Sequence, residues 1–416
     1  MTTPRILVFS TLFPSPAQPT AGVFIRERMF RVAQRLPLVV VSPRPWFPLQ
    51  GLIRRFRPHF RVPAPGFELH QGVEIHRPRF LSVPGLFRGL DSFSMALASF
   101  RLLRRLQRAE RFNLIDAHFA YPDGHAATLL GRWLSVPVSI TLRGTEVPLS
   151  RTRWRRDLMA RALRDADHVF SVSDSLRRHV GQLGVDPARV EVVGNGVDND
   201  RFHPVPRDEA RKALDLPAAA PVLISVGGLV ERKGFHRVIE CLPALRDAYP
   251  GLQYLIVGGP GPEGDWSERL HALVAEHGLQ DTVRFLGSIA PDKLKGPLSA
   301  SDVFVLATRN EGWANVLLEA MACGLPVVTT DVGGNREVVC DDRLGTVVPF
   351  GDPGALQAAL HDALGRDWDR AAIRAHARAN DWEARVDALC AAFDEMLRAR
   401  VAAASGITEG GVRGPC

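Results

Sequence analysis

Two glutamates in the second half of the sequence are spaced like a ligand-binding pair. Glu311 and Glu319 are separated by seven residues in TRNEGWANVLLEAMACGLPVVTTDVGG. Asn315 can cap a helix running to about Cys323, which would place Glu319 in its first turns and Glu311 in the preceding loop. The N–H groups and the dipole at such a helix start favour a phosphate, and carboxylates accept paired hydrogen bonds from the hydroxyls of a ribose or pyranose. The pattern suits a nucleotide sugar, although helix capping would explain either glutamate alone.

A basic pair lies upstream, in VGGLVERKGFHRVIEC. Arg232 and Lys233 fall in a loop after an expected strand, and Gly234 leads into the next helix. A guanidinium can bind a diphosphate with two parallel hydrogen bonds, and an ammonium group can act beside it as a point charge. The pair would then neutralise a diphosphate without a metal ion. A solvated, charged turn is the simpler explanation of such a pair in isolation.

Short apolar segments rich in Val, Ile and Phe alternate with helical segments along most of the chain. Strands this short and apolar are typical of parallel sheets covered on both faces, so the pattern predicts an α/β protein with two Rossmann-like, doubly wound parallel-sheet domains facing across a cleft. The expected strands are 5–10, 38–42, 113–118, 136–142, 167–173, 221–227, 252–258, 282–287, 302–307 and 326–331.

The domain boundary is expected where turn-forming residues gather in GNGVDNDRFHPVP. We therefore expect an N-terminal domain over residues 1–200 and a C-terminal domain over 205–382, which would carry the nucleotide-sugar site. A last amphipathic helix over 383–400 should pack back on the first domain, and 401–416 should form a disordered tail.

The two blocks that carry these residues resemble the signature of glycosyltransferase family 4, the group 1 glycosyltransferases of GT-B fold. The glutamate pair and the basic pair before glycine are both present, and NGVDNDRFHP is similar to the family's interdomain junction. The similarity covers residues 1 to about 385. One departure is Gly228, which occupies a place where the family usually has arginine, leaving Arg232 to supply the guanidinium.

The resemblance implies a role for each matching residue. Glu319 would bind the ribose hydroxyls of the donor and Glu311 the hydroxyls of the transferred sugar, while Arg232 and Lys233 would bind the diphosphate. The amides of Asn315, Val316 and Leu317 would complete the phosphate site. On the nucleotide side the resemblance adds Gly227 and Arg284.

In the first half, STLFPSPAQPTAGVFIRERMF resembles the family's Gly-rich loop after the first strand, with Gly22 near the phosphates and acceptor. His118, in DAHFAYPDGHAA, would line the cleft from the acceptor side. Many relatives have a histidine where SITLRGTEV has Arg143, and arginine cannot act as a general base at neutral pH. A charge-stabilising or acceptor-binding role is left for Arg143, so the expected catalytic residues are Glu311, Arg232, Lys233, His118 and Arg143.

The charge of the sequence is unevenly distributed. Residues 1–200 hold 29 arginines, no lysine and 16 acids, a net +13, whereas the rest of the chain has 23 bases and 29 acids, a net −6. Aromatic and arginine residues interleave in 45–63, and 101–111 forms a basic helix. Three interpretations are open for these segments: peripheral contact with an anionic membrane, an acceptor-binding lid, and nucleic-acid binding, which no recognised motif supports.

The five cysteines are odd in number and lack metal-ligand spacing, which fits a reduced compartment. We expect no secretory leader and no membrane span, and hence a cytoplasmic protein that acts at the inner face of the plasma membrane. Asp165 and Asp167 imitate a metal-binding DxD motif but sit at an expected helix end. We therefore expect neither a metal nor another cofactor.

The expected function is transfer of a sugar from a UDP- or GDP-sugar, with retention, to a saccharide or lipid-linked saccharide in cell-surface polysaccharide synthesis. Closure about Asn195–Pro206 would bring the domains together. One alternative is a nucleotide-sugar epimerase or hydrolase of the same fold. Another is a dinucleotide-dependent oxidoreductase, because the segment from Gly259 to Gly264 satisfies GxGxxG; its two prolines, which remove N–H donors, weigh against that alternative.

Overall fold

The segments predicted as strands lie at the centres of two separate sheets. The computed structural model describes residues 3–19, 21–48, 50–56, 60–83, 85, 88–261 and 263–404. The chain divides into two compact units. The first unit contains 1–172, 176–193 and the chain from Arg385, and the second contains 173–175 and 194–384.

The sheet of the first unit has eight strands, all parallel except the last pair. The first strand of the sequence lies inside this sheet, with β1 between β2 and β7. In spatial order the strands are β10 (Val190–Val192), β9 (His168–Ser171), β8 (Val138–Leu142), β7 (Leu114–His118), β1 (Ile6–Phe9), β2 (Leu38–Val41), β5 (Val73–His76) and β4 (Phe67–His70).

Helices cover both faces of this sheet. The side chains of Ile25 and Met29 from α1 and of Phe393 from α16 share one buried cluster with Val8. On the other face α4 packs against α3 and α6 and lies on β7 and β8. The helices of this unit are α1 (Val23–Ala33), α2 (Gln50–Phe56), α3 (Asp91–Arg108), α4 (His125–Leu134), α5 (Glu146–Leu149), α6 (Arg153–Asp165), α7 (Asp174–Gln182), whose first two residues belong to the second unit, and α16 (Trp382–Ala404), which enters this unit at Arg385.

The second unit has a six-stranded, fully parallel sheet with the strand order of a Rossmann fold. Its first strand, β11, lies between its second strand, β12, and its fourth, β14. The spatial order is β13 (Val283–Gly287), β12 (Gln253–Val257), β11 (Val222–Val226), β14 (Val303–Leu306), β15 (Val327–Thr330) and β16 (Gly345–Val348).

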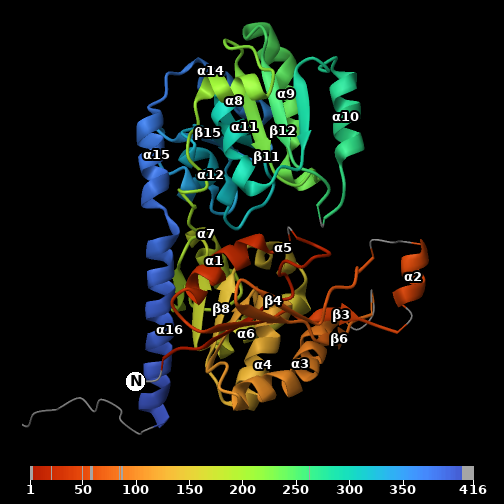
Figure 1. Cartoon of the computed structure of the whole chain (residues 1–416), viewed down its shortest axis with the longest axis vertical. Helices are drawn as coiled ribbons and strands as arrows, with labels where there is room; N and C mark the ends of the chain where they lie inside the picture. Colours follow the sequence, from red (N-terminus) through yellow and green to blue (C-terminus); the bar gives the residue numbers. More distant parts are fainter. Residues whose placement is uncertain are drawn as a thin grey trace, which may run out of the picture. The chain divides into compact units, whose positions relative to one another are not determined.

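Neighbouring residues of β11 face opposite layers of helices, as a strand covered on both sides requires. Leu223 packs in a cluster with α9, α10 and α14, and Ile224 packs in another with α11, α12 and α15. The helices are α8 (Arg207–Ala213), α9 (Phe235–Ala248), α10 (Ser267–Glu276), α11 (Lys295–Ala300), α12 (Asn315–Ala322), α13 (Asn335–Val338), α14 (Pro353–Gly365) and α15 (Arg370–Ala379) (Figure 1).

The ten predicted strands are all confirmed, within one or two residues at each end. The chain leaves the first unit at Val193, close to the predicted junction, and returns at Arg385. The last helix packs on the first unit and continues to Ala404, so 401–404 are helical and not part of a tail. Residues 405–416 lie outside the described residues.

The sequence did not predict the edge strands β10 and β16, nor four further strands whose apolar patterns are weak. In the β4–β5 hairpin, apolar residues alternate with polar ones, and Val73 and Ile75 of β5 are buried whereas Phe67 and Leu69 of β4 are exposed. Two short strands, β3 (Arg44–Trp46) and β6 (Arg79–Leu81), form a separate ribbon. Strands this short, with at most two buried residues each, carry little apolar signal of their own.

Candidate active site

The predicted donor-side residues of the second unit gather where its strand order reverses. The chain leaves β11 and β14 toward opposite sides of the sheet, and in open α/β sheets this point is where ligands bind. Arg232 and Lys233 lie in a single turn after β11, Glu231–Lys233, and Glu311 lies in the loop after β14. The carboxyl ends of adjacent strands therefore bring these residues together, as predicted.

One carboxylate oxygen joins the basic pair. Glu311 Oε1 accepts hydrogen bonds from Lys233 Nζ at 2.7 Å, from Arg232 Nη1 at 3.1 Å and from Thr308 Oγ1 at 3.1 Å. The side chain of Glu311 is only 11% exposed. Bonds of this kind between charged groups are short and strong when partly shielded from water, so the two cations are held side by side.

Arg232 has a second carboxylate partner that the sequence did not reveal. Glu263 accepts two parallel bonds from the guanidinium, at 2.9 Å from Nε and 2.6 Å from Nη2. The bond to Glu263, and then the charge of Glu311, raise the pKa of Arg232, and the same bond lowers the pKa of Glu263. Glu263 follows β12 in the Gly259–Gly264 segment and lies 31 residues from Arg232 along the chain.

Gly234 explains why a glycine follows the basic pair. Its φ is 78°, and a Cβ at this position would lie 1.9 Å from the carbonyl oxygen of Ala307. The first residues of α9 therefore pack directly on the end of β14, which fixes the turn that carries Lys233. The aliphatic stem of Lys233 in turn lies over Gly227.

The start of α12 differs in detail from the prediction. The helix begins at Asn315 with Ala314 as its cap, so Asn315 does not cap it. The side chain of Asn315 instead accepts a bond from Asn195 Nδ2 at 2.9 Å. The amide of Leu317 already donates to the carbonyl of Ala314 at 3.0 Å, whereas the amides of Asn315 and Val316 have no backbone acceptor among the described residues.

Glu319 lies one turn beyond Asn315 on the same face of α12 and is partly buried. Its charge adds to the effect of burial in raising the pKa of Cys323 to about 12. The structure thus confirms the expected order, with Glu311 in the loop and Glu319 in the helix.

Arg284 is not brought to this cluster. It is the second residue of β13, near the amino end of an edge strand, and its guanidinium donates to the carbonyl oxygen of Asp215 at 3.4 Å. In a parallel sheet all amino ends lie on one side and all carboxyl ends on the other. Arg284 therefore lies on the side opposite to Arg232 and Glu311, and the geometry does not support its assignment to nucleotide binding.

In the first unit the strand order reverses between β1 and β7. The loops at this point are held by hydrogen bonds to buried carboxylates. Glu146 accepts bonds from the backbone N–H groups of Ala120 at 3.1 Å, Arg143 at 3.2 Å and Gly144 at 2.7 Å. These bonds join the loops that follow β7 and β8. Glu146 is therefore a structural residue, and Arg143 is fixed through its backbone.

His118 and Arg143 contact each other. His118 is the last residue of β7 and is fully buried, and its Nδ1 lies 3.2 Å from Arg143 Nη2 and 3.4 Å from Nε. Burial, reinforced by the charge of Arg143, lowers the pKa of His118 well below its usual value. The imidazole is neutral at pH 7, and the nitrogen that would accept a proton already faces a guanidinium.

Gly22 caps α1 in a left-handed conformation with φ 70°. A Cβ there would lie 2.4 Å from the carbonyl oxygen of Leu12, so the loop after β1 folds tightly against the helix start. Asp123 holds the same loop, because its carboxylate accepts bonds from the backbone N–H and the hydroxyl of Thr11. Burial raises the pKa of Asp123 to about 7.

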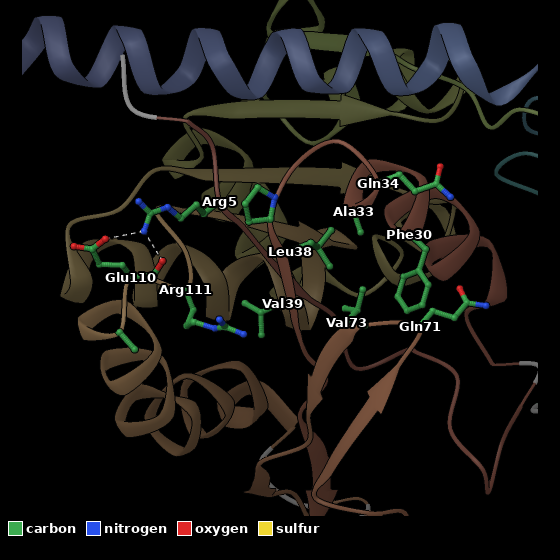
Figure 2. Close-up of a pocket in the computed structure, with 13 residues that line it drawn as sticks. Arg5, Phe30, Ala33, Gln34, Leu38, Val39, Gln71, Val73, Glu110 and Arg111 are labelled. Carbon is green, nitrogen blue, oxygen red and sulfur yellow. Dashed lines mark hydrogen bonds and ion pairs between the residues drawn. The ribbon is translucent and has the colours of Figure 1, made fainter.

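A cavity of about 620 Å³ lies at the amino ends of the strands of the first sheet, whereas His118 and Arg143 lie at the carboxyl ends. It is lined by the starts of β2 and β5 and by the Arg5–Glu110 ion pair of 2.9 Å (Figure 2). Since ligands of open α/β sheets bind at the carboxyl ends of the strands, the cavity is not the candidate site.

Two sequence motifs have structural roles. Asp165 ends α6 and pairs with Arg132, while Asp167 accepts the N–H of Val138 at 2.8 Å. Gly261 and Gly264 bond to each other's backbone, which occupies N–H groups that a pyrophosphate of a dinucleotide would need. Within the described ranges, no group of three or more His, Cys, Asp or Glu side chains is arranged to hold a metal ion.

The contact at Gly234 predicts an asymmetry between two glycines with the same backbone conformation. Gly251 has φ 79° but nothing within 4 Å of its Cβ position. We expect Gly251→Ala to lower the free energy of unfolding by about 1 kcal/mol and Gly234→Ala by about 3 kcal/mol, since only the latter also displaces α9. Urea unfolding measures both; equal losses would show that α9 does not depend on this contact.

Comparisons with known proteins agree with this geometry. Residues 206–380 match the profile of "Glycosyl transferases group 1" and residues 49–201 that of "Glycosyltransferase Family 4". The chain is 30% identical over 388 residues, 87% of each chain, to a D-inositol 3-phosphate glycosyltransferase of Corynebacterium urealyticum. It is 28% identical over 336 residues, 79% of this chain and 82% of the other, to TuaC of Bacillus subtilis, named as a teichuronic acid biosynthesis glycosyltransferase.

Solved structures show the same fold. A sucrose-phosphate synthase of Thermosynechococcus elongatus superposes with a TM-score of 0.75 at 22% identity, covering 96% of this chain and all of that one (100%). HepE of Anabaena, in complex with UDP and glucose, superposes with a TM-score of 0.70 at 19% identity over 94% and 99% of the two chains. The protein is thus a glycosyltransferase of GT-B fold, not an oxidoreductase, and it belongs to the family 4, group 1 glycosyltransferases.

Proposed function

We propose that the protein transfers a sugar, with retention, from a UDP- or GDP-sugar to a saccharide or lipid-linked saccharide in cell-surface polysaccharide synthesis. The observation that carries the donor half of this proposal is the bonding of Arg232 and Lys233 to one oxygen of Glu311 at the strand-order reversal of the second unit. The complex of HepE with UDP and glucose supports a nucleotide donor, and the name of TuaC supports a polysaccharide product.

The chemistry of the proposed donor site follows from charge. A leaving nucleoside diphosphate gains negative charge as its bond to the sugar breaks, and Lys233, Arg232 and the first amides of α12 would stabilise that charge. Glu319 would accept bonds from the ribose and Glu311 from the transferred sugar. In this proposal the two cations take the place of a metal, and no cofactor takes part.

Retention would follow a route that needs no protein base. The bond from the anomeric carbon to the phosphate oxygen breaks with its electron pair going to the phosphate, the acceptor oxygen bonds to the same face of that carbon, and the acceptor proton passes to the departing phosphate. Arg143 cannot accept a proton at neutral pH, and His118 is neutral with Nδ1 engaged by Arg143. Neither residue is therefore required to take a proton.

Glu311→Gln tests the donor site. We expect turnover to fall by about 100-fold or more, because a neutral amide binds the hydroxyls of the transferred sugar less strongly than the carboxylate does. The amide oxygen can still accept a bond from Lys233, so nucleoside diphosphate affinity should change little. Thermal shift with UDP, GDP and ADP first identifies the base, and release of the diphosphate with acceptor present gives turnover. Glu231→Gln, in the same basic turn but paired only with Arg309 among the described residues, is the matched control. A fully active Glu311→Gln enzyme would remove Glu311 from the site.

Glu263 should compete with the donor for Arg232. A phosphate that binds Nε and Nη2 must displace the Glu263 carboxylate, which already makes those two bonds. We expect Glu263→Gln to bind the nucleoside diphosphate about 3- to 10-fold more tightly, since a neutral amide holds the guanidinium less strongly. Isothermal titration measures the affinity, with Glu268→Gln, an exposed acid at the start of the adjacent α10, as control. Weaker binding would mean that the contact prepares Arg232 for the donor.

A lipid-linked acceptor requires access to a membrane, and we propose that the enzyme is cytoplasmic and docks on the inner face of the plasma membrane through α3. None of the described helices combines the length and the apolar character of a bilayer-spanning segment. Along one face of α3, Phe93 and Leu97 are 49% and 60% exposed, and the exposed Arg101, Arg104 and Arg108 follow at helical spacing. An apolar stripe with adjacent arginines fits an anionic bilayer surface.

Neighbouring residues extend this surface. Trp133 of α4 is 41% exposed and meets Phe93 and Phe100 edge to face, with ring centroids 6.2 and 5.7 Å apart. In the other basic segment, Leu52 and Phe56 of α2 are 54% and 81% exposed, whereas residues 49 and 57–59 lie outside the described residues.

Vesicle binding tests this docking face. The double variant R101E/R104E should lose about 30-fold or more in affinity for phosphatidylglycerol vesicles, at about 1 kcal/mol for each arginine near the surface. R246E/R269E changes the charge by the same amount on exposed helices of the second unit and should bind nearly as the parent does. An equal loss in both variants would show that only net charge matters, and no loss in either would exclude α3.

A further inference from the structure

Three polar side chains at the ends of β7 and β8 form a buried chain that ends on Arg143. Asp116 and His118 lie on β7, two residues apart and hence on the same face, and Arg143 directly follows β8. Asp116 is 1% exposed, His118 0% and Arg143 7%. Buried polar groups of this kind are costly unless their bonds are matched, so the pairing of donors and acceptors can be worked out.

The pairing leaves one consistent position for the imidazole proton. Arginine only donates, so His118 Nδ1, which faces Arg143 Nη2 at 3.2 Å, must be the acceptor. The proton of the neutral ring then lies on Nε2. That atom is 3.5 Å from Asp116 Oδ2, within ion-pair distance, and has no hydrogen-bond partner among the described residues.

The far end of the chain is also fixed. The hydroxyl of Ser139, paired with Asp116 across the two strands, donates to Asp116 Oδ1 at 2.7 Å. Asp116 therefore presents Oδ2 to the ring of His118.

We propose that Asp116 and His118 are positioning residues for Arg143: Asp116 selects the Nε2–H form of His118, whose Nδ1 then holds the guanidinium of Arg143 in place for transfer. The bonds of Glu146 fix the backbone of Arg143, and His118 fixes its side chain. The part that concerns transfer rests on the proposed function, whereas the proton position does not.

A purely structural role for Asp116 has to be separated from this one. Arg28 of α1 is fully buried, and its three guanidinium nitrogens make no hydrogen bond among the described residues. Burial lowers the pKa of Arg28 to about 10, and Asp116 is the first of the opposite charges that offset this effect. Asp116 could thus serve only to balance Arg28.

The first measurement is made on the protein without substitutions and uses a variant only to assign the signal. Long-range ¹H–¹⁵N NMR of the unmodified protein at pH 7, with His118→Gln to assign the signal, reports which ring nitrogen carries the proton. We expect Nε2–H. An Nδ1–H ring or a doubly protonated ring would overturn the proposal.

The second measurement tests whether a substitution moves the proton of His118 from Nε2 to Nδ1. In Asp116→Asn the amide oxygen accepts from Ser139, so the NH₂ group faces His118 and favours the Nδ1–H form, which sets an N–H against the Arg143 guanidinium. We expect the tautomer to switch and turnover to fall by about tenfold or more, while nucleoside diphosphate affinity stays within about twofold, as for a residue that acts through another. An unchanged tautomer or unchanged turnover would overturn the proposal.

The double variant R28M/D116N removes the buried charge that Asp116 would otherwise balance. We expect its melting temperature to return toward that of the parent and its turnover to stay low. Recovered turnover would show that Asp116 only balances Arg28, and the proposal would fail. If the unmodified protein binds no nucleoside diphosphate and releases none, the proposed function fails instead, and the NMR measurement still decides the proton position.

Discussion

A single carboxylate oxygen, Oε1 of Glu311, holds the loops that follow β11 and β14 to each other. Two positive groups placed side by side repel, and the turn that carries Arg232 and Lys233 would not keep them adjacent without an opposite charge between them. Glu311 supplies that charge, and Gly234 allows the turn to approach β14 closely enough for the bonds to form. The rest of the second unit positions these few atoms.

The first unit uses buried acids differently. The carboxylate oxygens of Glu146 and Asp123 accept hydrogen bonds from backbone N–H groups in the loops after β1, β7 and β8. These acids therefore fix the loops at the carboxyl ends of the strands and do not present charge to a ligand. Arg143 and His118 are then engaged with each other. The two units therefore differ in chemistry. The second brings together cations suited to a diphosphate, while the first holds polar groups already fixed by hydrogen bonds at the carboxyl ends of its strands.

Much of the fold and part of the site could be predicted from the sequence. The ten apolar strands were found because strands covered on both faces are continuously apolar, and the edge hairpin β4–β5 was missed because its pattern is half polar. Arg232, Lys233 and Glu311 were placed together because each follows a strand of one parallel sheet. Arg284 was misplaced since a residue at the start of a strand lies on the opposite edge, which a motif alone does not show.

By itself, the sequence determined the two parallel-sheet domains, the family and the loops that carry charge, because these depend on local pattern and on order along the chain. Only the tertiary structure decided which groups pair. Glu263 meets Arg232 from 31 residues away, and His118 meets Arg143 from 25 residues away. Such partners come from different strands and become neighbours only when the sheet is assembled, so no spacing in the sequence specifies them.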